Sequence, residues 1–223
     1  MIKEEELAAK FKETDAIIHG HFVLAGGDHS DIYLEKRKAT ADTELVSRIC
    51  LEFAMVAEDK DIDVVVGPAS GAISLAHETA KWLTFLYSLR GKKVLALYAD
   101  KKKVGNEEDF EFKGLFGQMV KGKKVLVVED ILTSGQSVKK VVKLIEAWEG
   151  IVVSVCAIWN RKKVTAATIG TPELFAIIDK PLSSWPADKC DLCKKEQPVY
   201  TLVGHGKEFL QQKGLERLKQ SYR

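Results

Sequence analysis

VLVVEDILTSGQSV, residues 125–138, carries the signals that place this chain in a fold class. Four apolar residues, three of them valine, predict a short buried strand. Two adjacent acids, Glu129 and Asp130, follow it, and a Thr-Ser-Gly turn then leads into a helix predicted over 136–148. In an open α/β sheet, ligands bind beyond the carboxyl ends of the strands. We therefore expect a binding site at the end of this strand.

The chemistry of this stretch suggests a ligand with two different halves. The turn presents backbone N–H groups and hydroxyls at a helix N-terminus, an arrangement that favours phosphate. Adjacent carboxylates suit hydroxyl groups, or a cation beside the phosphate. A phosphorylated ribose satisfies both requirements.

The rest of the chain predicts an α/β fold. Apolar runs predict strands, and segments with helical periodicity alternate with them, an order typical of a mainly parallel sheet covered on both faces. The expected strands are 61–67, 92–99, 121–130, 151–159 and 173–179, and the expected helices are 4–18, 43–57, 73–89, 136–148 and one from about residue 207. A short hairpin is expected within 20–39, and the charged segment 100–114 is expected to be a long loop.

Composition narrows the class of protein. The chain has 223 residues, a net charge of +2 and a pI near 8.2, a balance that argues against a nucleic-acid partner. No run of about 18 apolar residues predicts a membrane span. The acidic N-terminal segment has no apolar signal core, and four cysteines make no disulfide framework, so we expect a cytoplasmic protein.

Several segments together resemble one enzyme family. Residues 125–138 resemble the phosphoribosyl pyrophosphate (PRPP) signature of the type I phosphoribosyltransferases. Residues 20–37, GHFVLAGGDHSDIYLEKR, resemble the N-terminal segment of the orotate phosphoribosyltransferases, and 64–76, VVVGPASGAISLA, resemble that family's pyrophosphate loop. The tail CDLCKKEQPV is similar to the Cys-x-x-Cys tail of one branch. The resemblance covers residues 15–205.

The resemblance implies an architecture and a reaction. The fold would be one phosphoribosyltransferase domain, 1–223, with a hood region (1–40), an α/β core (41–180) bearing a flexible lid (100–114), and a C-terminal tail (181–223). The reaction would transfer ribose-5-phosphate from PRPP to orotate, giving orotidine 5′-monophosphate and pyrophosphate in pyrimidine biosynthesis. Mg²⁺ would be the cofactor, and a homodimer would share lid lysines across its interface.

The resemblance also implies roles for individual residues. Lys101, Glu129 and Asp130 would be catalytic, and Asp130 would hold Mg²⁺, directly or through water. Arg161 and Thr133 would bind orotate. The PRPP-binding residues would be Lys36, Ser70, Gly71, Lys101, Lys102, Glu129, Asp130, Thr133, Ser134, Gly135, Gln136 and Ser137. Without the flanking matches, the lysines of the lid would be interpreted as a solvated charged loop.

Three positions depart from the family pattern. Tyr98 lies where many members carry an arginine, Asn160 replaces an acid beside Arg161, and Ala25 replaces a lysine of some orotate enzymes. Three alternatives therefore stay open: a phosphoribosyltransferase for another nucleobase, a non-catalytic PRPP-binding regulator, and a degenerate paralogue of the enzyme.

Metal binding by the tail is also left open. Cys190 and Cys193 have metal-ligand spacing, but structural zinc needs about four ligands. The chain offers His205 downstream, and His19, His21, His29 and His77 show no ligand pattern.

Overall fold

The chain divides into two compact units. The computed structural model describes residues 2–24, 26–105 and 107–220. The core unit comprises Met1–Leu7 and Asp42–Pro181, and the hairpin–tail unit comprises Ala8–Ala41 and Leu182–Arg223. Helix α1 (Glu4–Glu13) contains the first boundary between them.

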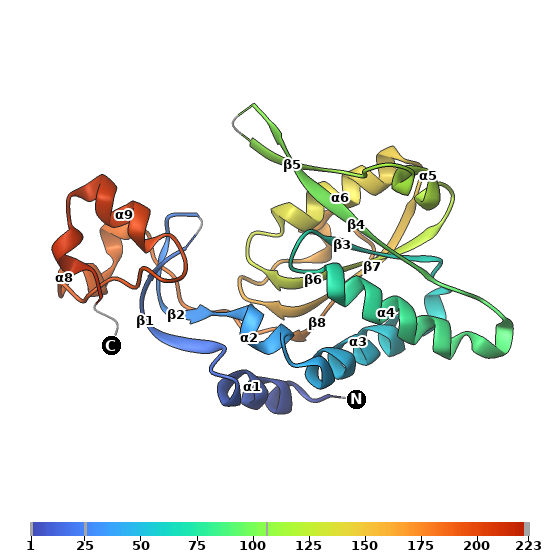
Figure 1. Ribbon diagram of the computed structural model, residues 1–223, viewed down its shortest axis with the longest axis horizontal. Helices are drawn as coiled ribbons and strands as arrows, with labels where there is room; N and C mark the ends of the chain where they lie inside the picture. Colours follow the sequence, from blue (N-terminus) through green and yellow to red (C-terminus); the bar gives the residue numbers. More distant parts are fainter. Residues whose placement is uncertain (1, 25, 106, 221–223) are drawn as a thin grey trace. The chain divides into compact units, whose positions relative to one another are not determined.

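The core unit is built on a six-stranded sheet with the strand order β5-β4-β3-β6-β7-β8 (Figure 1). Every neighbouring pair is parallel except β4 with β5. The mainly parallel sheet predicted from the sequence is confirmed. Its strands are β3 (Val64–Pro68), β4 (Leu95–Val104), β5 (Glu107–Glu111), β6 (Lys124–Leu132), β7 (Ile151–Asn160) and β8 (Leu174–Ile178).

Helices cover both faces of this sheet, which explains the continuous apolar runs of its central strands, such as residues 64–66 of β3 and 125–128 of β6. The core helices are α3 (Thr43–Ala57), α4 (Ile73–Leu86), α5 (Phe116–Val120), α6 (Gln136–Ala147) and α7 (Ala166–Ile169). On one face, Val64 and Val66 of β3 pack in one cluster with Val138 and Val142 of α6. Figure 1 shows α3 and α4 on the opposite face.

The hairpin–tail unit joins the two ends of the chain. Strands β1 (Ile17–Val23) and β2 (His29–Leu34) form an antiparallel hairpin. Isolated bridges pair His21 with Val199 and His29 with Trp185, so tail residues extend the hairpin on both strands. The helices of this unit are α2 (Lys36–Thr40), α8 (Asp191–Lys194) and α9 (Gly206–Lys213).

The structure corrects three expectations about these elements. The first helix ends at Glu13 instead of continuing to residue 18, because β1 begins at Ile17. Strand β6 runs two residues past Asp130. The charged segment 100–114 is largely a β-ribbon instead of a loop: β4 and β5 pair Lys102 with Asp109 and Lys103 with Glu108. Opposite charges across the two strands favour this pairing.

The described helices include none that is both long and apolar enough to cross a membrane.

Candidate functional site

The carboxyl ends of β3 and β6 mark the point where the sheet changes direction. From β3 the chain continues to β4 on one side, and from β6 it continues to β7 on the other. The two strands pair only from Val64 with Val125 to Val66 with Val127, so beyond these residues their chains are no longer joined. Ligands of open α/β sheets bind at this kind of switch point.

Glu129 and Asp130 lie on β6 just past the last pair with β3. Their residues are 7% and 2% exposed. The backbone N–H of Asp130 donates to Glu129 Oε1 at 2.9 Å, and that of Ile131 donates to Asp130 Oδ1 at 2.6 Å. These bonds fix the orientation of both carboxylates. The acids were expected at the strand end, but β6 continues to Leu132 because Ile131 and Leu132 still pair with β7.

Three residues separate β6 from helix α6, whose first amide, Gln136 N–H, donates to Ser134 Oγ at a long 3.4 Å. Its N-cap is Gly135, which has no side chain, and its first turn contains no acidic residue. Ser134, Gln136 and Ser137 are exposed around it, and Thr133 is half-buried. The amides of the first turn and the helix dipole therefore favour an anion at this end of α6.

Gly135 is required here for two independent reasons. Its φ of +73° is in the left-handed region, which side chains other than glycine rarely adopt. A Cβ at this position would also lie 2.7 Å from Ile169 Cγ2 and 2.9 Å from Val164 Cγ1. The turn into α6 is thus packed directly against the segment that follows β7.

Two buried residues mark the end of β7: Asn160 is its last residue, and Arg161 is the first residue after it. The N–H of Arg161 donates to Leu132 O at 3.0 Å, which places the arginine backbone beside the start of the 133–137 turn. Asn160 Nδ2 donates to Val164 O at 2.8 Å, and Val164 N–H donates to Asn160 Oδ1 at 2.9 Å. The side chain of Asn160 therefore fixes the conformation of residues 160–164 through these two hydrogen bonds.

The turn after β3 approaches a second helix N-terminus, that of α4. A Cβ on Gly67 would lie 2.4 Å from Ala72 O, so the turn closes tightly on the strand that leads into it. The peptide bond between Ala69 and Ser70 is cis. Ser70 is exposed and Gly71 half-buried, and Ala72 caps α4 with no side-chain hydrogen bond. Backbone groups are thus the main polar groups of this turn.

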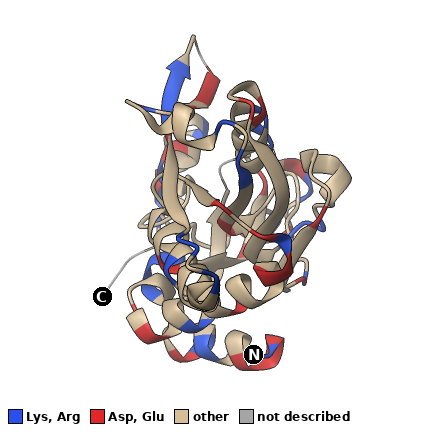
Figure 2. Ribbon diagram, turned by 90° about the vertical axis from the view of Figure 1, so that its right-hand side faces the viewer, with Lys and Arg blue, Asp and Glu red and all other residues tan. Residues whose placement is uncertain are grey.

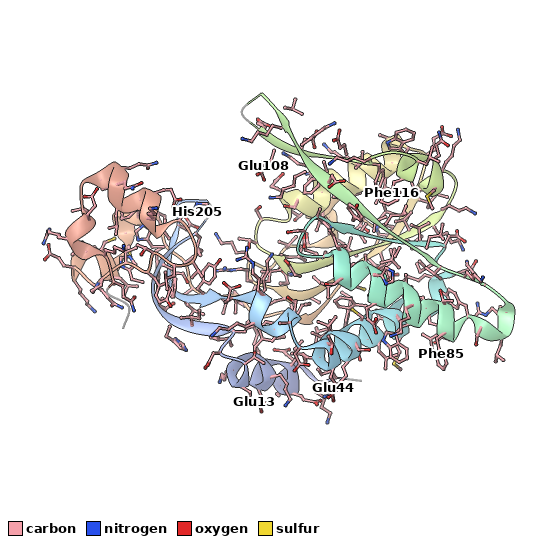
Figure 3. The ribbon with its side chains drawn as sticks, viewed as in Figure 1. Glu13, Glu44, Phe85, Glu108, Phe116 and His205 are labelled. Atoms are coloured by element: carbon pink, nitrogen blue, oxygen red, sulfur yellow. The ribbon has the colours of Figure 1, made fainter. Side chains whose placement is uncertain are left out.

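The β4–β5 ribbon carries the lysines expected in a lid. Lys101 Nζ lies 2.9 Å from Glu108 Oε2, and both side chains are more than half exposed. Figure 2 shows basic residues on one strand of the ribbon and acidic residues on the other. Lys140 of α6 donates to the carbonyl of Glu108, which Figure 3 labels on this ribbon. The hydrogen bond from Lys101 lowers the pKa of Glu108.

The base of the ribbon contains two further residues named from the sequence. Tyr98 stacks edge-on against Phe116, with ring centroids 5.3 Å apart. Lys102 faces Asp109 in the ribbon register. The residue found where many family members carry an arginine is thus a packing residue.

Lys36 belongs to the hairpin–tail unit, whereas the other predicted site residues belong to the core unit. It opens α2 and lines a pocket of about 320 Å³ together with Arg37, Tyr33 and residues 202–205. Ala25, the third departure noted in the sequence, lies outside the described residues.

The structure also brings together four residues that the sequence did not connect. His21, His29, Cys190 and Cys193 have potential ligand atoms within 4.8 Å of one another. The expectation that these histidines form no ligand pattern was wrong. The signal was missed because the histidine and cysteine pairs lie at opposite ends of the chain and are joined only by the folding of the hairpin–tail unit.

Comparisons with known proteins identify the family of this chain. The family described as "Phosphoribosyl transferase domain" matches residues 44–178. The orotate phosphoribosyltransferase of Caldicellulosiruptor saccharolyticus is 33% identical over 199 residues, covering 89% of this chain and 95% of the relative. That of Caldanaerobacter subterraneus is also 33% identical, covering 89% of this chain and 96% of the relative.

Solved structures share the fold. A phosphoribosyltransferase from Corynebacterium diphtheriae has a TM-score of 0.59 and 29% identity, covering 80% of this chain and 96% of its own. The orotate phosphoribosyltransferase of Mycobacterium tuberculosis, solved with PRPP, has a TM-score of 0.52 and 22% identity, covering 78% of this chain and 94% of its own.

Proposed function

This chain belongs to the phosphoribosyltransferase family, and from that premise we propose that it is an orotate phosphoribosyltransferase. It would transfer ribose-5-phosphate from PRPP to a ring nitrogen of orotate, releasing pyrophosphate and supplying orotidine 5′-monophosphate for pyrimidine synthesis. The names of relatives that align over most of their length support the choice of orotate.

One observation carries the proposal: two buried carboxylates precede a helix N-terminus whose N-cap, Gly135, has no side chain. The first turn of α6, with Thr133, Ser134, Gly135, Gln136 and Ser137, would bind the 5′-phosphate of PRPP through N–H and hydroxyl donors. Glu129 and Asp130 would accept hydrogen bonds from the ribose hydroxyls. A phosphorylated sugar would place its phosphate at the start of α6 and its diol at the carboxylates of β6.

The pyrophosphate would bind the turn after β3. Ser70 and Gly71 would donate backbone N–H groups to it at the start of α4. Lys101 and Lys102 of the β4–β5 ribbon would add positive charge, and the ribbon would act as a lid. The support for a lid is the exposure of the ribbon and its lysines.

Orotate would be recognised by Arg161 and Thr133. A planar guanidinium can donate two parallel hydrogen bonds to a carboxylate, and orotate differs from uracil by its carboxylate. The backbone bond between Arg161 and Leu132 supports this role, because it ties the arginine to the turn that would hold the ribose phosphate.

Mg²⁺ fits the residues at this site. Glu129 and Asp130 offer hard oxygen donors, and Mg²⁺ prefers one or two carboxylates together with phosphate oxygens and water. When bound, the ion would neutralise charge on the pyrophosphate group. Asp130, directly or through water, is the proposed ligand.

The catalytic work of the protein is then positioning and charge stabilisation. As the bond from the anomeric carbon to pyrophosphate breaks, positive charge builds on the ribose ring, as in glycoside cleavage. The fixed carboxylates of Glu129 and Asp130 orient the ring. Lys101 would stabilise the departing oxygen, and closure of the ribbon would exclude water that could capture the sugar instead of orotate.

A cytoplasmic homodimer with shared lid lysines completes the proposal. Three exposed apolar residues support burial by a second copy: Phe85 near the end of α4, which Figure 3 labels, Leu89 in the turn after α4, and Leu95 at the start of β4. Light scattering would measure the mass. Mixing the inactive Lys101→Ala and Asp130→Asn proteins would restore part of the activity only if subunits share sites.

The decisive experiment follows absorbance during incubation with PRPP and Mg²⁺, offering orotate, uracil, hypoxanthine and adenine separately. We expect turnover of orotate alone, abolished by omitting Mg²⁺. Turnover of another base would refute orotate as the substrate. PRPP binding without turnover of any base would favour a non-catalytic regulator.

Lys101→Ala provides the variant arm of this assay, and Lys121→Ala provides its matched control. Both lysines are exposed and ion-paired, Lys121 with Glu149 at 2.8 Å. Lys121, however, lies just before the amino end of β6, whereas the proposed site lies at the carboxyl ends of the strands. Lys101→Ala should lower kcat at least tenfold, with Lys121→Ala unchanged. Equal rates would exclude Lys101 from catalysis.

A further inference from the structure

Four side chains of the hairpin–tail unit direct their ligand atoms toward a common point. His21 is on β1, His29 opens β2, Cys190 precedes α8 and Cys193 lies within it. His21 Nε2 lies 2.9 Å from His29 Nδ1 and 3.6 Å from the Sγ atoms of both cysteines. His29 Nδ1 lies 3.3 Å from Cys193 Sγ.

These separations are close to those of a tetrahedral zinc site. With Zn–N bonds of about 2.0–2.1 Å and Zn–S bonds of about 2.3 Å, tetrahedral ligand atoms lie about 3.3–3.8 Å apart. The four measured distances run from 2.9 to 3.6 Å, and all ligand atoms of the group fall within 4.8 Å. The largest separation exceeds the tetrahedral values by up to about 1 Å, so a side-chain adjustment of that size would accommodate the ion.

The histidine rings are oriented for this role. His21 Nδ1 lies 2.9 Å from the carbonyl of Gln197, which can only accept, so in the neutral ring Nδ1 carries the proton and Nε2 presents its lone pair to the group. Hydrogen bonding of the distal nitrogen to a carbonyl is the usual support of a metal-binding histidine. Phe209 packs edge-on against His29, with centroids 4.7 Å apart.

His29 contacts the other ligand residues through its Nδ1 atom, which faces His21 Nε2 and Cys193 Sγ. Its Nε2 is buried without a hydrogen-bond partner in the part of the chain that the structure describes.

The group is buried and its backbone is fixed. His21, His29 and Cys190 are each at most 1% exposed. The N–H of His29 donates to Trp185 O at 2.7 Å, and Trp185 N–H donates back at 2.8 Å. Tyr200 N–H donates to His21 O at 2.8 Å. The side chains are thus held together by backbone pairing on both strands of the hairpin.

We propose that His21, His29, Cys190 and Cys193 bind a structural zinc ion. Two imidazoles and two thiolates fill all four tetrahedral positions, so the site keeps no open position for substrate. Binding would release the two thiol protons. The ion lies within the hairpin–tail unit and stands apart from the proposed transfer reaction.

Its effect is to join the hairpin near the N-terminus to the tail near the C-terminus. The buried apolar cluster between them is small, with Val23, Val199 and Leu210 at its centre. Folded units of about 70–80 residues or fewer commonly depend on metals or disulfides because their cores supply little stability. Zinc would supply the missing cross-link.

The competing interpretation is a Cys190–Cys193 disulfide, or a reduced group held by hydrogen bonds alone. The full chain, expressed without an affinity tag that binds metal and purified with reductant, should contain one zinc per chain by elemental mass spectrometry. Cys193→Ser and His29→Ala should lose it. The controls His19→Ala, an exposed histidine on the same strand, and Cys50→Ala, a buried cysteine elsewhere, should keep it.

A second measurement covers the case in which the ligand variants fail to fold. Wild-type protein produced with Co²⁺ in place of zinc should show the ligand-field bands of a tetrahedral site and thiolate-to-cobalt charge transfer. A wild-type chain without zinc and without this spectrum would overturn the proposal. So would a Cys190–Cys193 disulfide under reductant, or zinc retained in the folded Cys193→Ser protein.

Discussion

Asn160 and Val164 are joined by two buried hydrogen bonds, and the side chain of Val164 packs so closely on Gly135 that a Cβ there would lie 2.9 Å from Val164 Cγ1. A loop beside the proposed base site is thereby coupled to the turn of the proposed phosphate site. The side chain that departs from the family's acid is the one that fixes this coupling.

Asn160→Ala should destabilise the protein by about 1–3 kcal/mol, because it leaves the N–H and carbonyl of Val164 without their partner. The midpoint of urea unfolding measures this loss. Gln118→Ala, which removes an exposed amide from α5, should change stability by less than about 0.5 kcal/mol. Equal effects would show that the two bonds contribute nothing specific.

Gly135→Ala should raise the KM for PRPP at least tenfold. The left-handed φ alone costs about 1–2 kcal/mol for alanine, and the collision with Ile169 and Val164 adds to it. Gly122→Ala is the matched control, since its φ is +67° but no atom lies within 4 Å of the added Cβ. It should lose stability and keep its KM. Similar KM values for the two variants would refute the packing argument.

Gln136→Glu should move stability and activity in opposite directions. A carboxylate in the first turn of α6 complements the helix dipole and stabilises the protein by about 0.3–1 kcal/mol. It also repels the ribose phosphate, so the KM for PRPP should rise. Gln136→Lys should reverse both signs. Thermal melts and initial rates on the same preparations test this, and a phosphate site elsewhere would leave KM unchanged in both.

Glu108→Gln should lower the KM for PRPP by less than about fivefold. In the wild type, Lys101 has to break its ion pair with Glu108 before it can bind the pyrophosphate, and the variant removes that ion pair. Glu107→Gln on the same strand, opposite Val104, should have no effect.

The difference between Glu108→Gln and wild type should depend on pH in a defined direction. Lys101 lowers the pKa of Glu108, so the pair exists above that pKa and is lost as the pH falls through it. The advantage of the variant should therefore shrink in acid. An advantage that grows in acid would contradict the pairing.

The central sheet could be predicted from the sequence because its signals are local. The apolar runs of β3, β6 and β7 and the periodicity of Thr43–Ala57 each identify an element without reference to the others. The acids and the turn of residues 129–137 could be placed at one site for the same reason. Strand ends were less accurate, since β6 is prolonged by pairing with β7.

The ribbon and the cysteine–histidine group were missed because their causes are not local. Lysine and glutamate have low strand propensity, and β4 extends through Lys103 only because β5 lies opposite it. His21 and Cys190 are brought together only because Trp185 and Val199 pair with the hairpin. The spacing of residues along the sequence does not predict this long-range pairing.

The discontinuous hairpin–tail unit has a consequence for synthesis on the ribosome. Its hairpin, β1 and β2, is translated first, yet its partners Trp185 and Val199 are translated only after the whole six-stranded sheet. Domains generally fold as units during translation, so the sheet can fold while the hairpin still waits for its partners. The hairpin, although made before the sheet, would be among the last segments to become ordered, and a nascent chain stalled before Trp185 would expose it unpaired to chaperones and proteases.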